Sequence, residues 1–157
     1  MIEGSSTALG RKRITAPFRW LIENEVPLNE PGLDFGCGRS IDAEVYGWDK
    51  YDPCWFPEYP QGIYRTITCT YVLNVIPIEK QIEVLQQIRE VLHSSQGHAY
   101  ISVRRDLKQD RPGRGCVQRL VKLVTQPIYT KVGSFAIYDI TPQNMREVVS
   151  GLQQQGI

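Results

Sequence analysis

Apolar residues recur at helical spacing in two stretches of the chain. In the first, behind Pro77, they predict an amphipathic helix from Ile78 to about His93: Ile78, Ile82, Leu85, Ile88 and Leu92. In the second, behind Thr141 and Pro142, they predict a final helix: Met145, Val148, Val149 and Leu152. A shorter helix, with Pro17 in its first turn, is expected to end near Asn24.

Apolar and β-branched runs between these helices predict strands. Leu33 to Phe35 reads as a short buried strand, and Thr66 to Tyr71 has the composition of a central strand. His98 to Val103 is a further strand, and Ser40 to Tyr46 is expected to form a helix of only about two turns. Two later segments are expected to pair antiparallel and close one edge of the sheet: Val117 to Val124 and Ser134 to Ile140.

The strand at Leu33 ends in a glycine turn that carries an acid. Asp34 stands two residues before Gly36, and Cys37 and Gly38 follow. Because neither glycine has a Cβ, the backbone of such a turn can touch a ligand directly. The turn therefore predicts a binding site for a nucleotide-like cofactor.

These residues resemble motif I of the class I S-adenosylmethionine-dependent methyltransferases. That motif is an apolar strand followed by Asp or Glu, one residue and Gly-x-Gly-x-Gly; Asp34, Gly36 and Gly38 match it, and Ser40 stands at the third glycine. The resemblance implies S-adenosyl-L-methionine as the cofactor, and it places four residues of the turn in contact with it: Asp34, Gly36, Cys37 and Gly38.

The competing dinucleotide pattern, G-x-G-x-x-G, would need a glycine where Ile41 stands. The methyltransferase resemblance covers most of the chain, from about Thr7 to Ile140. It implies an α/β domain with a reduced Rossmann-like fold, a mostly parallel twisted sheet with an antiparallel edge hairpin, and helices on both faces. It extends to small methyltransferases of phages and of DNA-phosphorothioation gene clusters, which begin with segments like Thr7 to Arg11 and Thr15 to Pro17.

A second match, from Gly47 to Pro53, resembles the end of the second strand in this family. The family carries an acid there that binds the ribose hydroxyls, and Asp52 lies close to the ~20-residue offset expected for such an acid. Asp49 is the alternative, and either acid could instead be an ordinary turn residue. The resemblance implies that Asp52 and Pro53 contact the cofactor.

A third match, from Tyr64 to Pro77, resembles the fourth strand and the loop that faces the reactive methyl group. It implies that Thr70 contacts the cofactor and that Tyr71 and Asn74 align a substrate heteroatom. The alternative is that Asn74 caps the following turn and Tyr71 packs. The (Asp/Asn)-Pro-Pro-Tyr motif of many amino and amide methyltransferases is absent here, which leaves the acceptor atom open.

Residues 53–63 are too few and too rich in proline for a full helix and a strand. The third strand of the fold is therefore expected to be reduced or absent. With it goes the acid by which this family binds the adenine amino group. Trp55 or Phe56 either stacks on the adenine or fills the sheet edge that the missing helix leaves bare.

Composition limits the remaining possibilities. The 157 residues are expected to form one domain, with residues 1–14 extended or flexible, and the net charge of +1 argues against a nucleic-acid-binding field over the whole surface. No apolar run reaches the ~18 residues of a membrane span, which predicts a cytoplasmic protein with no membrane partner. Cysteines without a CxxC pair or His cluster indicate reduced thiols and no metal site: Cys37, Cys54, Cys69 and Cys116.

Basic residues gather behind the strand at His98, around a Pro-Gly-Arg-Gly loop: Arg104, Arg105, Lys108, Arg111, Arg114, Arg119 and Lys122. This segment is either a mobile lid over a phosphate-bearing substrate or a solvated loop. Arg104 and Arg105 are the substrate-binding candidates within it. Arg11, from a basic cluster near the N-terminus, is a third candidate if that cluster is more than a solvated tail.

Together these features predict an S-adenosyl-L-methionine-dependent methyltransferase that acts on a nucleic acid or on a small polar or phosphorylated acceptor. Methyl transfer needs no catalytic triad, because positioning of the reactants supplies much of the rate. One alternative is a non-catalytic module that binds S-adenosylmethionine or nucleic acid. Another is an enzyme that consumes the cofactor without transferring methyl.

Overall fold

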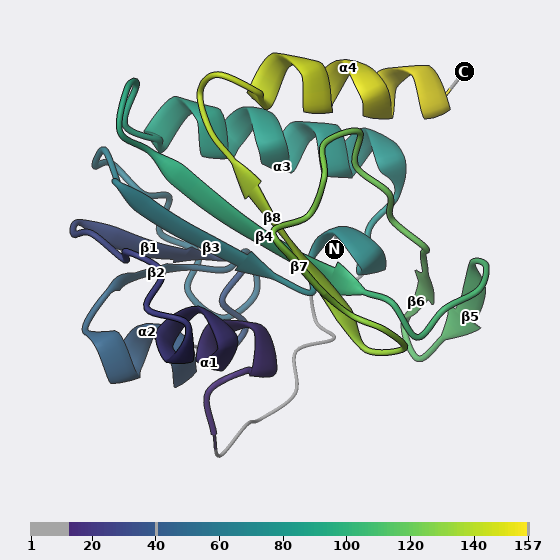
Figure 1. Ribbon diagram of the computed structural model, residues 1–157, viewed down its shortest axis with the longest axis horizontal. Helices are drawn as coiled ribbons and strands as arrows, with labels where there is room; N and C mark the ends of the chain where they lie inside the picture. The colour runs from purple at the N-terminus through teal and green to yellow at the C-terminus, as the bar shows by residue number, and fades with distance from the viewer. Residues whose placement is uncertain (1–12, 40, 157) are drawn as a thin grey trace.

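The computed structural model describes residues 13–39 and 41–156. At its centre is a twisted six-stranded sheet with the order β2-β1-β3-β4-β8-β7 (Figure 1). The strands β2, β1, β3 and β4 are parallel, whereas β8 runs antiparallel to β4 and β7 antiparallel to β8. The predicted sheet, mostly parallel with an antiparallel edge, is confirmed. Its strands are β1 Gly32–Phe35, β2 Asp49–Tyr51, β3 Thr66–Thr70, β4 His98–Arg104, β7 Tyr129–Lys131 and β8 Phe135–Ile140.

Helices cover both faces of this sheet, as predicted (Figure 1). On one face lie α1 (Ala16–Glu23) and α2 (Ile41–Tyr46), and the cluster beneath them contains Phe18, Leu21, Ala43, Trp48, Tyr100 and Ile137. On the other face lie α3 (Ile78–Val91) and α4 (Met145–Gln155), over a larger cluster that contains Ile67, Leu85, Ile88, Ile101, Met145 and Leu152. The apolar stripes read from the sequence are therefore the faces that these helices bury.

The final helix begins later than the sequence predicts. Thr141 and Pro142 form a turn in front of it, because the Asn144 side-chain oxygen accepts a hydrogen bond from the Thr141 amide at 2.8 Å. Asn144 then serves as the N-cap, and α4 starts at Met145. A local side-chain bond to the backbone has competed with the first helical turn.

A buried carboxylate joins the beginnings of α1 and α2. The Asp42 carboxylate accepts from the Thr15 amide at 2.8 Å and from the Thr15 hydroxyl at 2.6 Å. Thr15 in turn caps α1, since its hydroxyl accepts from the Phe18 amide at 3.4 Å. Asp42 thus fixes α1 against the glycine turn that precedes α2.

No strand or helix forms between β2 and β3, where the sequence predicts a reduced or absent third strand. The loop after β2 closes on itself instead: the amide and carbonyl of Asp52 pair with those of Phe56, each at 3.0 Å. Trp55 and Phe56 then lie beside β2, where they border a shallow depression with Trp48 and Lys50. β2 is consequently the free edge of the sheet.

The predicted pairing of Val117 to Val124 with the last strand is wrong. Its first residues form β6 (Cys116–Gln118), which pairs with β5 (Arg111–Gly113) in a separate hairpin that projects from the sheet (Figure 1). The neighbour of β8 is β7, which reaches it through a tight turn where Gly133 has φ +72°. The strand character of this segment reflects burial, since two of its side chains enter the core while their backbone stays outside the sheet: Val121 and Leu123.

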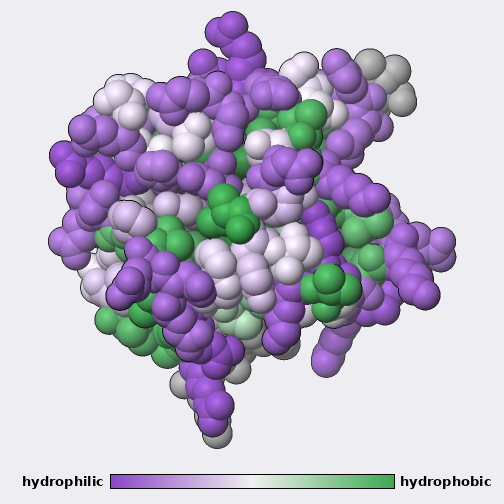
Figure 2. All heavy atoms as spheres, viewed as in Figure 1, coloured by the Kyte–Doolittle hydropathy of each residue, from purple (hydrophilic) through white to green (hydrophobic). Residues whose placement is uncertain are grey.

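Apolar side chains on the face shown in Figure 2 are scattered among polar ones. Isolated exposed apolar residues of this kind are normal for a globular surface. No helix of residues 13–39 and 41–156 combines the length and apolar character needed to cross a membrane.

Replacement of Asp42 by Ala should lower the free energy of unfolding by about 2 kcal/mol, because two hydrogen bonds to a buried carboxylate are lost. Glu44→Ala is the matched control: Glu44 lies on the same helix, is exposed, and contacts Lys50 at 3.5 Å. That variant should change the free energy of unfolding by less than about 0.5 kcal/mol. Urea unfolding measures both, and equal effects would contradict the role given to Asp42.

Candidate functional site

A cavity of about 560 Å³ opens at the carboxyl ends of β1, β2 and β3. This is where ligands bind in open α/β sheets, because the loops that follow parallel strands meet there. The cavity is lined by the glycine turn, by residues that follow β2, β3 and β4, and by one face of α3. Its volume lies within the ~300–1,000 Å³ typical of small-molecule sites.

The glycine turn forms one wall of the cavity, and its geometry requires glycine. Gly36 and Gly38 have φ of +73° and +55°. A Cβ on Gly36 would lie 2.5 Å from Cγ2 of Val72, so a side chain would clash as well as strain the backbone. The amides of Gly36 and Cys37 both donate to the carbonyl of Tyr51, at 2.7 and 3.0 Å. The turn is therefore held against the end of β2, with its backbone facing the cavity.

Asp52 lies where the ribose-binding acid is predicted, directly after β2 and on the cavity wall. Its carboxylate accepts from the amide of Gly38 at 2.9 Å, and from the amides of Cys54 and Trp55 at 2.8 and 3.1 Å. A carboxylate has about four acceptor positions, so one more donor can bind. Pro53 lines the cavity beside it.

Asp49, the alternative, lies elsewhere. Its carboxylate accepts from the hydroxyl of Tyr64 at 2.6 Å, and its side chain does not line the cavity. Of the two acids at the second strand, only Asp52 is placed to contact a ligand there.

Asp34 is buried in β1 and lines the cavity with only 4% of its surface exposed. Burial raises the pKa of Asp34 to about 8, and the nearby carboxylates of Asp42 and Asp52 raise it further, while a hydrogen bond from Thr68 at 3.2 Å opposes the rise. These acidic side chains line one cavity, so its field favours a cation. Burial also raises the pKa of the Cys37 thiol, and Asp34 and Asp52 raise it further, which keeps the thiol neutral.

The exit of β3 forms the opposite wall, where Thr70, Tyr71 and Asn74 all line the cavity. Tyr71 has φ of +60°, a conformation that costs a non-glycine residue roughly 1–3 kcal/mol, and its amide donates to Ser102 O at 2.9 Å. Strain of this order at a cavity wall is typical of functional sites.

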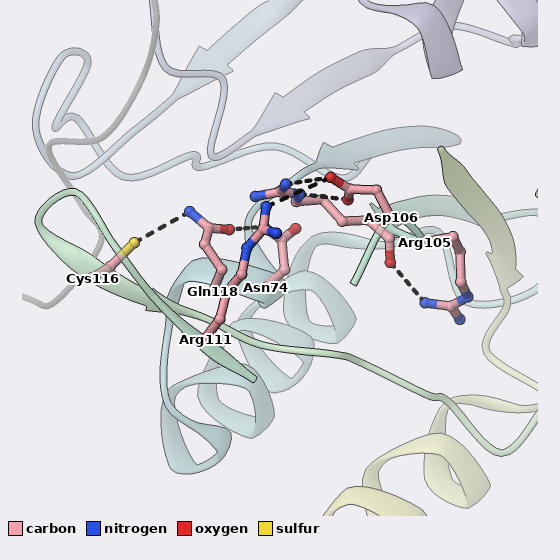
Figure 3. A network of polar contacts seen from close by, with 7 residues as sticks. Asn74, Arg105, Asp106, Arg111, Cys116 and Gln118 are labelled. Carbon is pink, nitrogen blue, oxygen red and sulfur yellow. Dashed lines mark hydrogen bonds and ion pairs between the residues drawn. The ribbon is translucent and has the colours of Figure 1, made fainter. Parts of the chain in front are cut away.

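Asn74 lies in the short 3₁₀ helix η1 (Leu73–Val75), and its side chain is 1% exposed. Its amide nitrogen donates to the Gln118 side-chain oxygen at 3.1 Å, which ties the β5–β6 hairpin to η1 (Figure 3). Its Oδ1 atom has no hydrogen-bond partner within the described part of the chain. A buried unpaired acceptor on a cavity wall is a place for a ligand donor.

Arg104, which ends β4, and Arg105, which follows it, have different surroundings. Arg104 lines the cavity, and its Nε donates to Asp106 Oδ1 at 2.8 Å in a bidentate pair. Arg111 approaches the Asp106 carboxylate to 3.9 Å (Figure 3). Arg105 does not line the cavity: its guanidinium donates to the carbonyl of Val121 at 2.7 Å and to the Tyr138 hydroxyl. Arg11, the third candidate, lies outside the described residues.

Several lining residues were not predicted from the sequence. Trp55 and Phe56, the aromatic candidates for the adenine, do not line the cavity; the Arg39 guanidinium lies 4.6 Å from the Trp55 ring and the Lys50 amine 5.0 Å from that of Phe56. The aromatic side chain on the wall is that of Tyr51. A stripe along α3 also lines it, at positions outside the apolar face predicted from the sequence: Lys80, Glu83, Val84 and Gln87.

No group of three or more His, Cys, Asp or Glu side chains among the described residues is arranged to hold a metal ion. The cysteines are free thiols, as expected: Cys37, Cys54, Cys69 and Cys116.

No protein-family model and no curated protein matches the sequence. Solved structures with a similar fold include the glycopeptide N-methyltransferase MtfA complexed with S-adenosyl-L-methionine, at 16% identity and a TM-score of 0.45 over 95% of this chain and 82% of that chain. Another is magnesium protoporphyrin IX methyltransferase (ChlM) from Synechocystis PCC 6803 with bound SAM, at 13% identity and a TM-score of 0.45 over 83% of this chain and 85% of that chain. A third is an S-adenosylmethionine-dependent methyltransferase from Mesorhizobium loti, at 11% identity and a TM-score of 0.46 over 87% of this chain and 80% of that chain. These similarities are too distant to assign a function, which has to be inferred from the cavity itself.

Asp34→Asn should remove a pH dependence of stability. The pKa of Asp34 is about 8 in the folded protein, whereas the ordinary value of 3.8 applies in the unfolded chain. As the pH rises, the unfolded chain therefore releases this proton before the folded protein does. The protonated Asp34 therefore contributes stability that is fully present below about pH 4 and is lost progressively as the pH rises from about 4 to about 8. At ~1.4 kcal/mol per pH unit, the unfolding free energy of the wild type should fall relative to Asp34→Asn by about 3 kcal/mol between about pH 5 and 7.5.

Urea unfolding at the two pH values measures this difference. The control is Glu58→Gln, which removes an exposed carboxylate and should leave the wild-type dependence unchanged. A wild-type curve parallel to that of Asp34→Asn would mean that Asp34 titrates normally.

Proposed function

We propose that this protein is an S-adenosyl-L-methionine-dependent methyltransferase. The observation that carries the proposal is the cavity wall on which the glycine turn meets Asp34 and Asp52. A backbone without Cβ atoms, a carboxylate with one free acceptor position and an acidic field occur together there. S-Adenosyl-L-methionine offers the matching groups: a ribose diol, a cationic sulfonium and a cationic ammonium.

The residues present fit that ligand. The open backbone at Gly36, Cys37 and Gly38 would take its amino-acid end, and Asp52 with Pro53 would take the ribose. Asp34 lies within the same field, and a cation beside it would lower its pKa and favour its carboxylate form. Thr70, on the facing wall, completes the set predicted to contact the cofactor. When bound, this cofactor supplies an electrophilic methyl group.

The part of the chain in this mechanism is to position the acceptor and to exclude water. Tyr71 and Asn74 stand at the exit of β3, and the unpaired Oδ1 of Asn74 can accept a hydrogen bond from the reacting group of the acceptor. Such a bond orients the lone pair of the nucleophile, and orientation of this kind can supply much of a rate enhancement. In the described chain His93 and His98 do not line the cavity, so the site relies on position and not on a histidine base.

We propose that the methyl group is transferred to a nucleic acid or to a small polar or phosphorylated molecule. Arg104 is the basic candidate on the wall, but its bidentate pair with Asp106 neutralises much of its charge. A phosphate would have to share that pair, with help from Arg111. We also propose that the protein is related to the small methyltransferases of phages and of DNA-phosphorothioation gene clusters, and that it is cytoplasmic.

The missing third strand favours a second candidate, a non-catalytic module that binds S-adenosylmethionine. In the described residues 52–65 no acid apart from Asp52 lines the cavity. This segment therefore lacks the acid that binds the adenine amino group in the methyltransferase family. A module of this kind would bind the cofactor and transfer nothing.

Asp52→Ala should weaken the binding of S-adenosylhomocysteine at least about tenfold, because a charged hydrogen-bond acceptor is lost. Asp49→Ala is the matched control, since Asp49 is an acid of the same strand region outside the cavity. It should leave the affinity within about threefold of the wild type. Isothermal titration calorimetry measures both. Equal affinities for the Asp52 variant and the wild type would place the ribose elsewhere.

Asn74→Leu should separate transfer from binding. The variant keeps the volume of the side chain, so its affinity for S-adenosylhomocysteine should stay within about threefold of the wild type, whereas methyl transfer should fall at least about tenfold. Mass spectrometry of RNA, DNA and a panel of small polar acceptors incubated with S-adenosyl-L-methionine measures the transfer. A wild-type protein that binds the cofactor and methylates none of them would favour the non-catalytic module.

A further inference from the structure

One wall of the cavity comes from α3, a helix whose opposite face fills the core. Its cavity stripe runs through Lys80, Glu83, Val84 and Gln87, which follow one another at helical spacing. Lys80 and Glu83 satisfy each other, because the Lys80 amine lies 2.8 Å from the Glu83 carboxylate. Gln87 is half-buried and has no hydrogen-bond partner among the described residues. The stripe therefore presents one free carboxamide to the cavity.

This helical wall faces the residues at the end of β2. The Tyr51 ring lies between those of Phe35 and Tyr59, at 4.9 and 5.3 Å, and the Tyr59 hydroxyl bonds Glu90 of α3 at 3.4 Å. The loop after β2 is thereby tied to α3, with no strand between them. Tyr51 and Pro53 flank Asp52, so this part of the cavity adjoins the proposed ribose site.

We propose that Gln87 recognises the adenine of S-adenosyl-L-methionine, an inference that rests on the proposed function. A carboxamide carries a donor and an acceptor side by side, and adenine presents an amino donor next to a ring-nitrogen acceptor. Glutamine is a residue that pairs with both at once when proteins read adenine in DNA. Tyr51 and Val84 supply the flat apolar surfaces for the ring. Gln87 thus takes the place of the acid that the missing third strand would carry.

Other side chains suit this role less well. Glu83 could accept from the amino group, but it is exposed and engaged by Lys80. Trp55 and Phe56 do not line the cavity.

Calorimetry with two ligands tests the proposal without any need for turnover. The first ligand is S-adenosylhomocysteine, and the second is its analogue in which purine without the 6-amino group replaces adenine. The variants are Gln87→Leu and Gln87→Met, which remove the carboxamide at nearly constant size. Gln86→Leu is the matched control, because Gln86 is the adjacent glutamine on the same helix and points to solvent.

The wild type and Gln86→Leu should bind S-adenosylhomocysteine at least about fivefold more tightly than the analogue, because only the former offers the amino donor. Both Gln87 variants should lose that preference and bind the two ligands within about twofold of each other. If a Gln87 variant keeps the wild-type preference, Gln87 does not read the base, although the cofactor assignment stands. If the wild type binds neither ligand, the proposed function itself fails. Having two Gln87 variants keeps the result readable if one of them unfolds.

Discussion

The whole site depends on hydrogen bonds that fasten the glycine turn to the end of the neighbouring strand. Two amides of the turn share the carbonyl of Tyr51, and a third donates to the carboxylate of Asp52. A turn with positive φ at two glycines has few contacts of its own, so these bonds decide where its backbone faces. They also bring the end of β1 and the end of β2 together. The turn and the acid can therefore face one cavity as a preformed pair.

The same arrangement concentrates acidity in a small volume. Asp34, Asp42 and Asp52 lie near enough for the last two to raise the pKa of the first. The side chains of Asp42 and Asp52 accept hydrogen bonds from backbone amides, whereas Asp34 accepts only from a hydroxyl. Protonation of Asp34 relieves the repulsion when no cation is nearby. The protein thus tolerates a buried acidic cluster whose charge can adapt to a ligand.

Much of this could be predicted from the sequence, because local patterns encode it. The stripe of α3, the β-branched run of β3 and the positions of Asp34 and Asp52 were all readable, and the short loop after Asp52 predicted the missing strand. The hairpin of residues 111–118 was not, since the apolar residues of Val117 to Val124 indicate which side chains are buried but not which backbone groups pair.

Which side chains face the cavity was harder still to predict. Arg104, the last residue of β4, lines the cavity, whereas Arg105, the first residue after the strand, contacts Val121 and Tyr138. Their common charge suggested a common role. The contribution of α3 could not be read either, because it depends on the space left by a strand that the chain lacks.

The two faces of α3 have a lasting consequence for how this protein can vary. Leu85 and Ile88 are fully buried in the core, and their immediate neighbours Val84 and Gln87 line the cavity. Consecutive residues of a helix are about 100° apart, so an insertion of one residue upstream in α3 would turn Val84 and Gln87 into the core, and a deletion of one residue would turn Leu85 and Ile88 towards the cavity. Substitutions can alter each face separately, but the rotation of the helix about its own axis is fixed by the core on one side and by the cavity on the other. Changes in chain length should therefore accumulate in the loops and spare this helix.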